Sequence, residues 1–301
     1  MNSADSLDST LIPYLVGEGL RRRFQRNDIE AIDSSEVGLY TSDGALFVDK
    51  LLGRGVDVIV YGLTLRALPL QPVARYVSRI GDEMSLGDLV RMARIGGAPW
   101  LVDNLGAEHV ITGVVRTNWA TYAYRSSLRR FIWESTLEPV APSWPALERM
   151  FKLPAHDWQV LVAPRQVGKS PYEWTREAYG IPNPNWEALD LIGRMCQRYA
   201  PGRCVLYAGP VNPFGRDRTA EPGLYEDYLA HVRIIVGRYG LIFRDYTDTM
   251  SRADFRKPKY GGQRDSIHLN EAGRAALANL LVGPVAQAMQ QAIDEHDGSR
   301  R

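Results

Sequence analysis

Apolar and polar residues follow one another along the chain in patterns that alternate between helical and extended periods. From Glu271 to Ala292 apolar residues recur every three or four positions, which predicts a long amphipathic helix. Asn270 stands directly before it and is of a residue type favoured at the N-cap. From Val56 to Tyr61 nearly every residue is apolar, as expected for a strand of a parallel sheet that is covered on both faces.

The same reading predicts alternating helices and strands at both ends of the chain. We expect helices at 10–25, 41–52, 186–199, 225–238 and 271–292, and strands at 28–33, 56–61, 204–208 and 241–243. Strand, helix and strand at this spacing form βαβ units. The fold class is therefore predicted to be α/β with a parallel sheet.

The middle of the chain has a different composition. Residues 71–185 are rich in aromatic residues and are interrupted by prolines. We expect a helical insertion there, between two parts of an α/β core at 1–70 and 186–293, and a disordered tail at 294–301. The insertion is either a lid or substrate wall, or a helical layer that completes the core.

Composition excludes several classes of protein. A chain of 301 residues can bury a sizeable core, and its net charge of +1 does not favour nucleic acid or an anionic membrane as a partner. Cys196 and Cys204 predict neither a disulfide framework nor a metal site, and the five histidines lack metal-ligand spacing. We expect no metal and no cofactor. No apolar run could span a bilayer and no signal peptide is evident, so the chain as written is expected in the cytoplasm.

The strongest candidate for chemistry is an Asp-x-x-His turn just before the last predicted helix. In Asp265-Ser266-Ile267-His268 the carboxylate can face the imidazole of its own histidine. Such a carboxylate fixes the tautomer and supports the imidazolium that forms when the histidine takes a proton from a nucleophile. The alternative is a polar cap on a surface helix.

A second motif, at 163–170, fits a relaxed phosphate-loop pattern that ends in Gly168-Lys169-Ser170. Phosphate binding needs backbone amides at a helix N-terminus and a later strand that ends in a magnesium-binding aspartate. Pro164 lacks an amide, Ala163 replaces the first glycine, and no such strand follows. Nucleotide binding is therefore a remote alternative.

The order of these blocks resembles the SGNH hydrolase superfamily, which includes GDSL-type esterases and polysaccharide O-acetyltransferases. The resemblance covers about 1–66 and 186–290 and rests on three blocks: Val37-Gly38-Leu39-Tyr40, Gly62-Leu63-Thr64, and Asp265 to His268 followed by Leu269-Asn270-Glu271-Ala272-Gly273. It implies a flavodoxin-like three-layer α/β/α sandwich with a parallel sheet.

The resemblance also implies a metal-independent serine triad. His268 would act as general base and then as general acid, and Asp265 would orient it. The amides of the serine and of Gly38 would stabilise the oxyanion. Thr64 stands where the family has an asparagine that donates to the oxyanion. Arg66 is either a contact for an anionic group of the substrate or part of a surface salt bridge.

The nucleophile is open between two serines, because the first strand of the family's sheet is missing from the chain. Ser3, in Asn2-Ser3, and Ser9, in Asp8-Ser9, are the alternatives, and Ser9 could instead cap the first helix. We expect that the stated start is internal and that upstream codons encode an apolar strand. A signal or anchor before that strand would direct the protein to the cell envelope.

These observations favour a serine acyl-ester hydrolase or O-acyltransferase that works through an acyl-serine intermediate. An acylated carbohydrate or lipid is the expected substrate, with no nucleic acid partner and no integral membrane segment in the chain as given. The main alternative is a catalytically inactive binding or scaffold protein of the same fold.

Overall fold

The computed structural model describes residues 11–33, 41–65, 68, 85–105, 110–111, 183–213, 221–256 and 268–299. The chain divides into two compact units. One combines Met1–Gln71 with Ser170–Arg301, and the other is Pro72–Lys169.

The first unit is built on a parallel sheet of three strands among its described residues. The strands are β1 (Ile59–Leu63), β2 (Cys204–Ala208) and β3 (Ile242–Asp245), in the order β1-β2-β3. Leu63 pairs with Ala208, and Ala208 pairs with Asp245, so the three carboxyl ends are level with one another. Residues that follow the strands therefore leave the sheet along one common edge.

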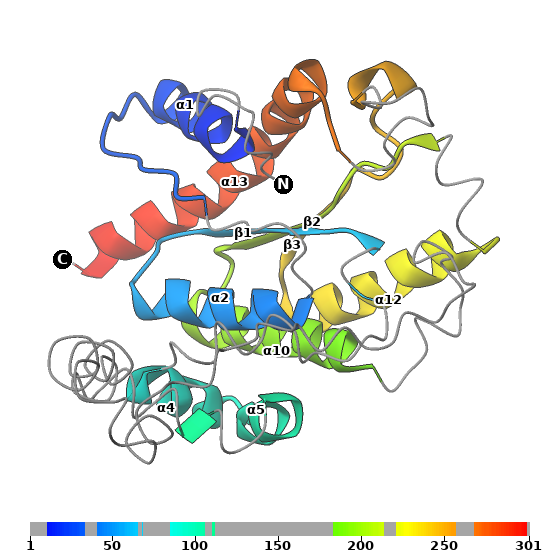
Figure 1. Cartoon of the computed structure of the whole chain (residues 1–301). Coiled ribbons are helices and arrows are strands. Elements are labelled where there is room, and N and C mark those ends of the chain that lie inside the picture. The colour runs from blue at the N-terminus through cyan, green and yellow to red at the C-terminus, as the bar shows by residue number, and fades with distance from the viewer. Residues whose placement is uncertain are drawn as a thin grey trace, which may run out of the picture. The chain divides into compact units, whose positions relative to one another are not determined.

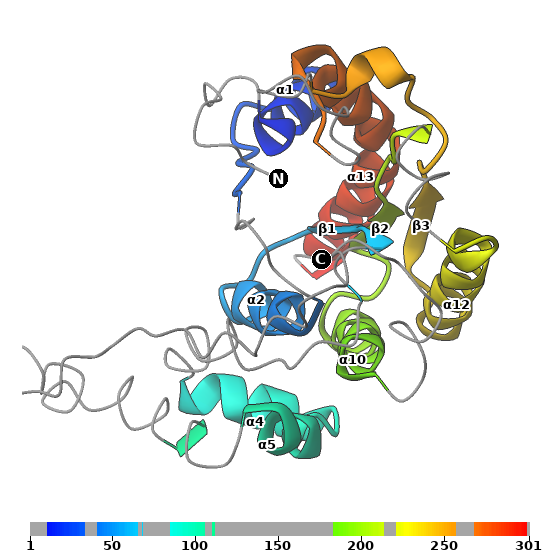
Figure 2. The same cartoon turned by 45° about the vertical axis from the view of Figure 1, so that its right-hand side comes forward.

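Helices cover both faces of this sheet. α1 (Ile12–Phe24) and α13 (Glu271–Ser299) lie on one face, and α2 (Thr41–Gly53), α10 (Pro184–Tyr199) and α12 (Leu224–Tyr239) lie on the other (Figures 1 and 2). A short 3-10 helix, η7 (Arg252–Asp254), precedes α13. The described part of this unit is thus a mixed α/β structure.

The α1 and α13 face is held by an apolar cluster. Leu20 of α1 packs with Leu281 and Val285 of α13, and all three are nearly inaccessible to solvent. Within α13, Pro284 has no amide hydrogen to donate to the carbonyl of Leu280. That carbonyl instead accepts a hydrogen bond of 2.9 Å from the hydroxyl of Tyr246, which follows β3.

The opposite face contains a buried polar network at the start of α2. The amide of Ser42 donates to Asn185 Oδ1 at 3.1 Å, and the amide of Asn185 donates to Asn183 Oδ1 at 2.9 Å. The side chain of Asn183 donates to the carbonyl of Leu68 at 2.8 Å. These bonds satisfy polar groups that would be costly to bury alone, and they fix the first turn of α2 against α10.

The second unit is helical in its described part. It contains α4 (Leu86–Arg94) and α5 (Ala98–Leu105). Ser85 and Asp88 form a capping box in which each side chain accepts from the other residue's amide, at 3.1 and 2.7 Å. The phosphate-loop motif at 163–170 lies outside the described residues.

Most predicted elements of the first unit are confirmed, and β2 has both predicted ends. The predicted strand at 28–33 is wrong, because this segment has no regular structure. Ile29 is buried in the α1 and α13 cluster, and its carbonyl accepts from Arg21 Nε at 2.8 Å. The segment therefore docks on α1 rather than in a sheet.

The last helix is longer than the sequence indicates. α13 continues to Ser299, so the predicted end at 292 is too early, and 294–299 form helical turns where disorder was expected. Two contacts hold these turns to the rest of the unit. His296 Nε2 lies 3.1 Å from Asp57 Oδ1, and Glu295 lies 3.3 Å from Arg203 Nε.

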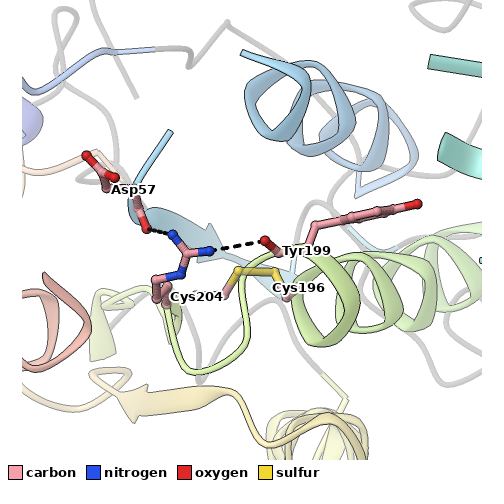
Figure 3. Close-up of a disulfide and its surroundings, with 5 residues drawn as sticks. Asp57, Cys196, Tyr199 and Cys204 are labelled. Carbon is pink, nitrogen blue, oxygen red and sulfur yellow. Dashed lines mark hydrogen bonds between the residues drawn. A yellow bond between two sulfur atoms is a disulfide. The ribbon is translucent and has the colours of Figure 1, made fainter. Parts of the chain in front are cut away.

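The sequence predicted no disulfide framework, but the two cysteines do form a single disulfide. Cys196, near the end of α10, is bonded to Cys204, the first residue of β2, with 6.0 Å between their Cα atoms (Figure 3). Gly202, at φ +67°, lies in the short turn that brings the two together. One pair of cysteines at this spacing carries no motif, so the sequence alone did not reveal the bond.

No helix in the described part of the chain is long and apolar enough to cross a membrane.

Candidate functional site

The carboxyl edge of the sheet is the place where the structure gathers polar groups from several segments. Backbone bonds join the segments that leave the three strands. Gly209 N donates to the Leu63 carbonyl at 2.7 Å, Tyr246 N to the Ala208 carbonyl at 3.0 Å, and Val211 N to the Thr247 carbonyl at 3.0 Å. In parallel sheets this edge is where ligands commonly bind.

Thr64 is the first residue after β1 and is partly buried there. The segment after β2 passes directly beside it. A Cβ added at Gly209 would lie 3.3 Å from both the Leu63 carbonyl oxygen and Thr64 Cγ2. Glycine at 209 thus leaves room for the two segments to approach closely, and the bond from Gly209 N to the Leu63 carbonyl fixes the residue before Thr64.

Asp245, at the end of β3, has a structural role. Its Oδ1 accepts from the hydroxyl of Thr247 at 2.6 Å and from the Thr247 amide at 3.2 Å. Its Oδ2 lies 2.8 Å from Arg233 Nη2. Because both oxygens are engaged, this carboxylate fixes the turn after β3 and is not a candidate for proton transfer.

His268 is held by a short antiparallel contact between the segments before and after the 257–267 region. Phe255 and Leu269 form an antiparallel bridge. On either side of it, Arg256 N donates to the His268 carbonyl at 2.9 Å, and Asn270 N donates to the Asp254 carbonyl at 2.8 Å. The backbone of His268 is therefore fixed next to η7, and its side chain is partly exposed.

Asn270 fixes the start of α13, as the sequence predicts. Its Oδ1 accepts from the amide of Gly273 at 2.9 Å, which is the N-cap bond. Its Nδ2 donates to the carbonyl of Ala253 at 2.6 Å, so the cap also ties the helix to η7. In both views, η7 and the first turn of α13 lie near the chain that leaves the carboxyl end of β2 (Figures 1 and 2).

Two of the predicted site residues, Thr64 and His268, are described by the structure. The others, which are Ser3, Ser9, Gly38, Arg66 and Asp265, lie outside the described residues. Their predicted roles stay predictions.

Arginines near His268 are a feature that the sequence analysis missed. Arg256 forms the backbone bond to His268 described above, and Arg274 lies in the first turn of α13 with 8% of its surface exposed. Burial lowers the pKa of the Arg274 guanidinium, the charge of Arg256 lowers it further, and Glu271 raises it. The available signal was the surplus of Lys and Arg around the Asp-x-x-His turn.

A groove of about 250 Å³ between α10 and α12 is a weaker candidate. Its lining includes Trp186, His231 and Ile234, and Asp190 in the lining pairs with Arg194 and Arg238. Asp190 accepts 2.8 Å bonds from Arg238 and from the Tyr239 hydroxyl. Burial lowers the pKa of His231, the Arg238 charge acts in the same direction, and Asp190 opposes both. The imidazole contacts the Trp186 ring, as in ordinary packing.

Metal ligands are not gathered in the described part of the chain, where no three residues of the types His, Cys, Asp and Glu stand together in a way that could hold an ion. Comparison of the chain with protein-family models, with curated proteins and with solved structures finds no match.

Proposed function

We propose that the protein is an SGNH-like serine acyl-ester hydrolase or O-acyltransferase with a flavodoxin-like three-layer α/β/α sandwich. One observation carries the proposal. The backbone of His268 is held by an antiparallel contact with the segment after η7 and by the capped start of α13, and η7 follows the last of three parallel strands whose carboxyl ends are level. A general base must be held in this way beside the substrate-binding edge of a sheet.

The proposed reaction uses Ser3 or Ser9 as nucleophile. The serine oxygen bonds to the acyl carbon of an ester while its proton passes to His268, which Asp265 orients. His268 then gives this proton to the departing alcohol as the ester bond breaks, leaving an acyl-serine. In the second half, the oxygen of water or of an acceptor hydroxyl bonds to the acyl carbon and its proton passes to His268. The bond between the acyl carbon and the serine oxygen then breaks, and His268 returns the proton to that oxygen.

Charge develops on the carbonyl oxygen in both halves of the reaction. The amide of Gly38 and the hydroxyl of Thr64 are the proposed donors to that oxygen. The backbone bond from Gly209 to Leu63, directly before Thr64, supports this role, because preorganised donors stabilise a transition state more than mobile ones. Hydrolase and transferase differ only in the second acceptor, and an acylated carbohydrate or lipid suits either.

A fluorophosphonate probe tests the proposal directly. It should label one serine, and peptide mapping should place the label at Ser3 or Ser9. Hydrolysis of p-nitrophenyl acetate should fall in His268→Ala and persist in the control His296→Gln, whose histidine is exposed at the far end of α13. Equal hydrolysis by wild type and His268→Ala would contradict the proposal and favour the inactive scaffold.

The disulfide supports a location in an oxidising compartment such as the cell envelope rather than in the cytoplasm. Cys196 and Cys204 are both buried, and disulfides form and persist where thiols are not kept reduced. Alkylation of protein from freshly lysed cells, with and without a reductant, checks this by mass. Full alkylation without a reductant would contradict it.

A further inference from the structure

Arg256 and His268 are cross-strand neighbours. The antiparallel bridge pairs Phe255 with Leu269, so the next residue of one segment stands opposite the previous residue of the other. The hydrogen bond from Arg256 N to the His268 carbonyl, at 2.9 Å, extends this register by one position. Side chains directly opposite each other in an antiparallel pair lie on the same side, roughly 5 Å apart at Cβ.

The side that these two residues share is the one turned away from the core. Phe255 and Leu269 belong to the buried apolar cluster, with 1% and 6% of their surface exposed. Successive side chains of an extended segment point to opposite sides. Arg256 and His268 are accordingly both partly exposed, unlike their neighbours in the bridge.

The guanidinium of Arg256 is held beside the backbone of Leu269, the residue that follows His268. Its Nε donates to the carbonyl of Leu269 at 3.4 Å, a long bond that directs the side chain along the backbone next to His268. This keeps a permanent positive charge beside the proposed general base.

The sequence around this position contains more basic than acidic residues. Arg274 adds a second cation within electrostatic range of Arg256, with Glu271 as the opposing acid. The Asp254 carboxylate is engaged by the amide and hydroxyl of Ser251, at 2.8 and 2.7 Å. In the sequence, the stretch 252–274 contains six Lys or Arg and three Asp or Glu, whereas the whole chain is nearly balanced.

We propose that Arg256 is a specificity residue that selects esters carrying a carboxylate or phosphate group close to the reacting carbonyl. The inference rests on the proposed function, since it assigns a substrate class to the same site. Arginine suits this role because its planar fork matches the two oxygens of a carboxylate or phosphate. An anion bound there places the carbonyl of the same small substrate beside His268.

Two matched pairs of esters test the proposal. p-Nitrophenyl butyrate and mono-p-nitrophenyl succinate have acyl chains of the same length, and only the second carries a carboxylate. Phenyl acetate and 4-acetoxyphenyl phosphate place the charge on the alcohol instead, as a phosphate. Wild type should have a kcat/KM about 10- to 100-fold higher for at least one anionic ester than for its neutral partner.

Three variants show whether Arg256 causes that preference. Arg256→Gln should remove the preference by raising KM for the anionic ester more than KM for its neutral partner. Arg256→Lys should keep part of it. The control Arg244→Gln, at an exposed arginine of β3 whose Nη1 donates to the Phe243 carbonyl, should keep all of it.

Each outcome supports or overturns the inference. Hydrolysis of charged and neutral esters at equal rates would overturn it and leave the proposed function intact, as would a preference that survives in Arg256→Gln. Absence of any hydrolysis by wild type, together with absence of fluorophosphonate labelling, would overturn the proposed function and this inference with it.

Discussion

The two edges of the sheet differ in what their polar groups do. At the amino edge, the Cys196–Cys204 disulfide and the Arg203 side chain join separate segments. Arg203 donates to the Asp57 carbonyl at 3.4 Å and to the Tyr199 carbonyl at 3.2 Å (Figure 3). These contacts connect α10 and the starts of β1 and β2. At the amino edge, side-chain hydrogen bonds and the disulfide therefore stabilise the packing of α10 against the strands.

At the carboxyl edge, backbone hydrogen bonds hold the segments together, and several side chains stay partly exposed. Thr64 and His268 are held by contacts of their neighbours and of their own backbone. Chemistry requires side chains that reach substrate from a rigid support. The contrast suggests that changes at the carboxyl edge will affect activity, and changes at the amino edge will affect stability.

The largest effect is expected for His268→Ala. Removal of the general base should lower kcat/KM for p-nitrophenyl acetate by about 10³-fold or more. The melting temperature should change little, since His268 contributes its backbone rather than its side chain to the antiparallel contact. Ester hydrolysis and differential scanning fluorimetry measure the two quantities. A large fall in melting temperature with unchanged activity would show that His268, at the carboxyl edge, serves stability rather than catalysis.

Thr64→Val should have the next largest effect. This variant keeps the shape of the side chain and removes the hydroxyl, so the loss of an oxyanion donor should lower kcat about 10²-fold. Thr64→Ser keeps the hydroxyl and serves as the matched control. If both variants retain full turnover, Thr64 is a packing residue and the carboxyl edge has one fewer reactive group than proposed.

At the amino edge, the double variant Cys196→Ala/Cys204→Ala should be less stable. Loss of a disulfide that closes a short loop should lower the free energy of unfolding by about 2.5 kcal/mol, as measured by urea denaturation. Hydrolysis at low temperature should be unchanged. A fall in kcat without a change in stability would show that the two edges are not separate in function.

The smallest effect is expected for His296→Gln. The contact of His296 with Asp57 is exposed, with 63% and 54% of the two side chains accessible. Its loss should change the free energy of unfolding by about 0.5 kcal/mol or less, and should not change activity. A larger loss of stability would mean that the contact between His296 and Asp57 stabilises the amino edge more than exposed contacts usually do.

The sequence correctly predicted those elements that are determined by residues close together in the chain. The strand Cys204–Ala208 was predicted with correct ends, because an apolar run lies between Gly202 and Gly209. The cap at Asn270 was predicted because its side chain bonds a residue three positions away. In both cases the determining contact is close in sequence.

Long-range partners explain what the sequence could not predict. In the segment 28–33 apolar and polar residues alternate as in a strand. Arg21 Nε, however, donates a hydrogen bond to the Ile29 carbonyl, and the segment packs on α1. Arg256 stands opposite His268 only because a bridge joins residues 255 and 269. Such pairings depend on how the chain folds back on itself, and no local pattern encodes them.

The substitution of a tyrosine hydroxyl for a missing amide has a mechanical consequence for the longest helix. Because Pro284 cannot donate to the Leu280 carbonyl and Tyr246 does so instead, α13 is attached about a third of the way along its length to the segment that leaves β3. A shift of that segment would tilt the part of the helix that precedes residue 280. The position of the imidazole at residue 268 would then follow from a bond made three helical turns away.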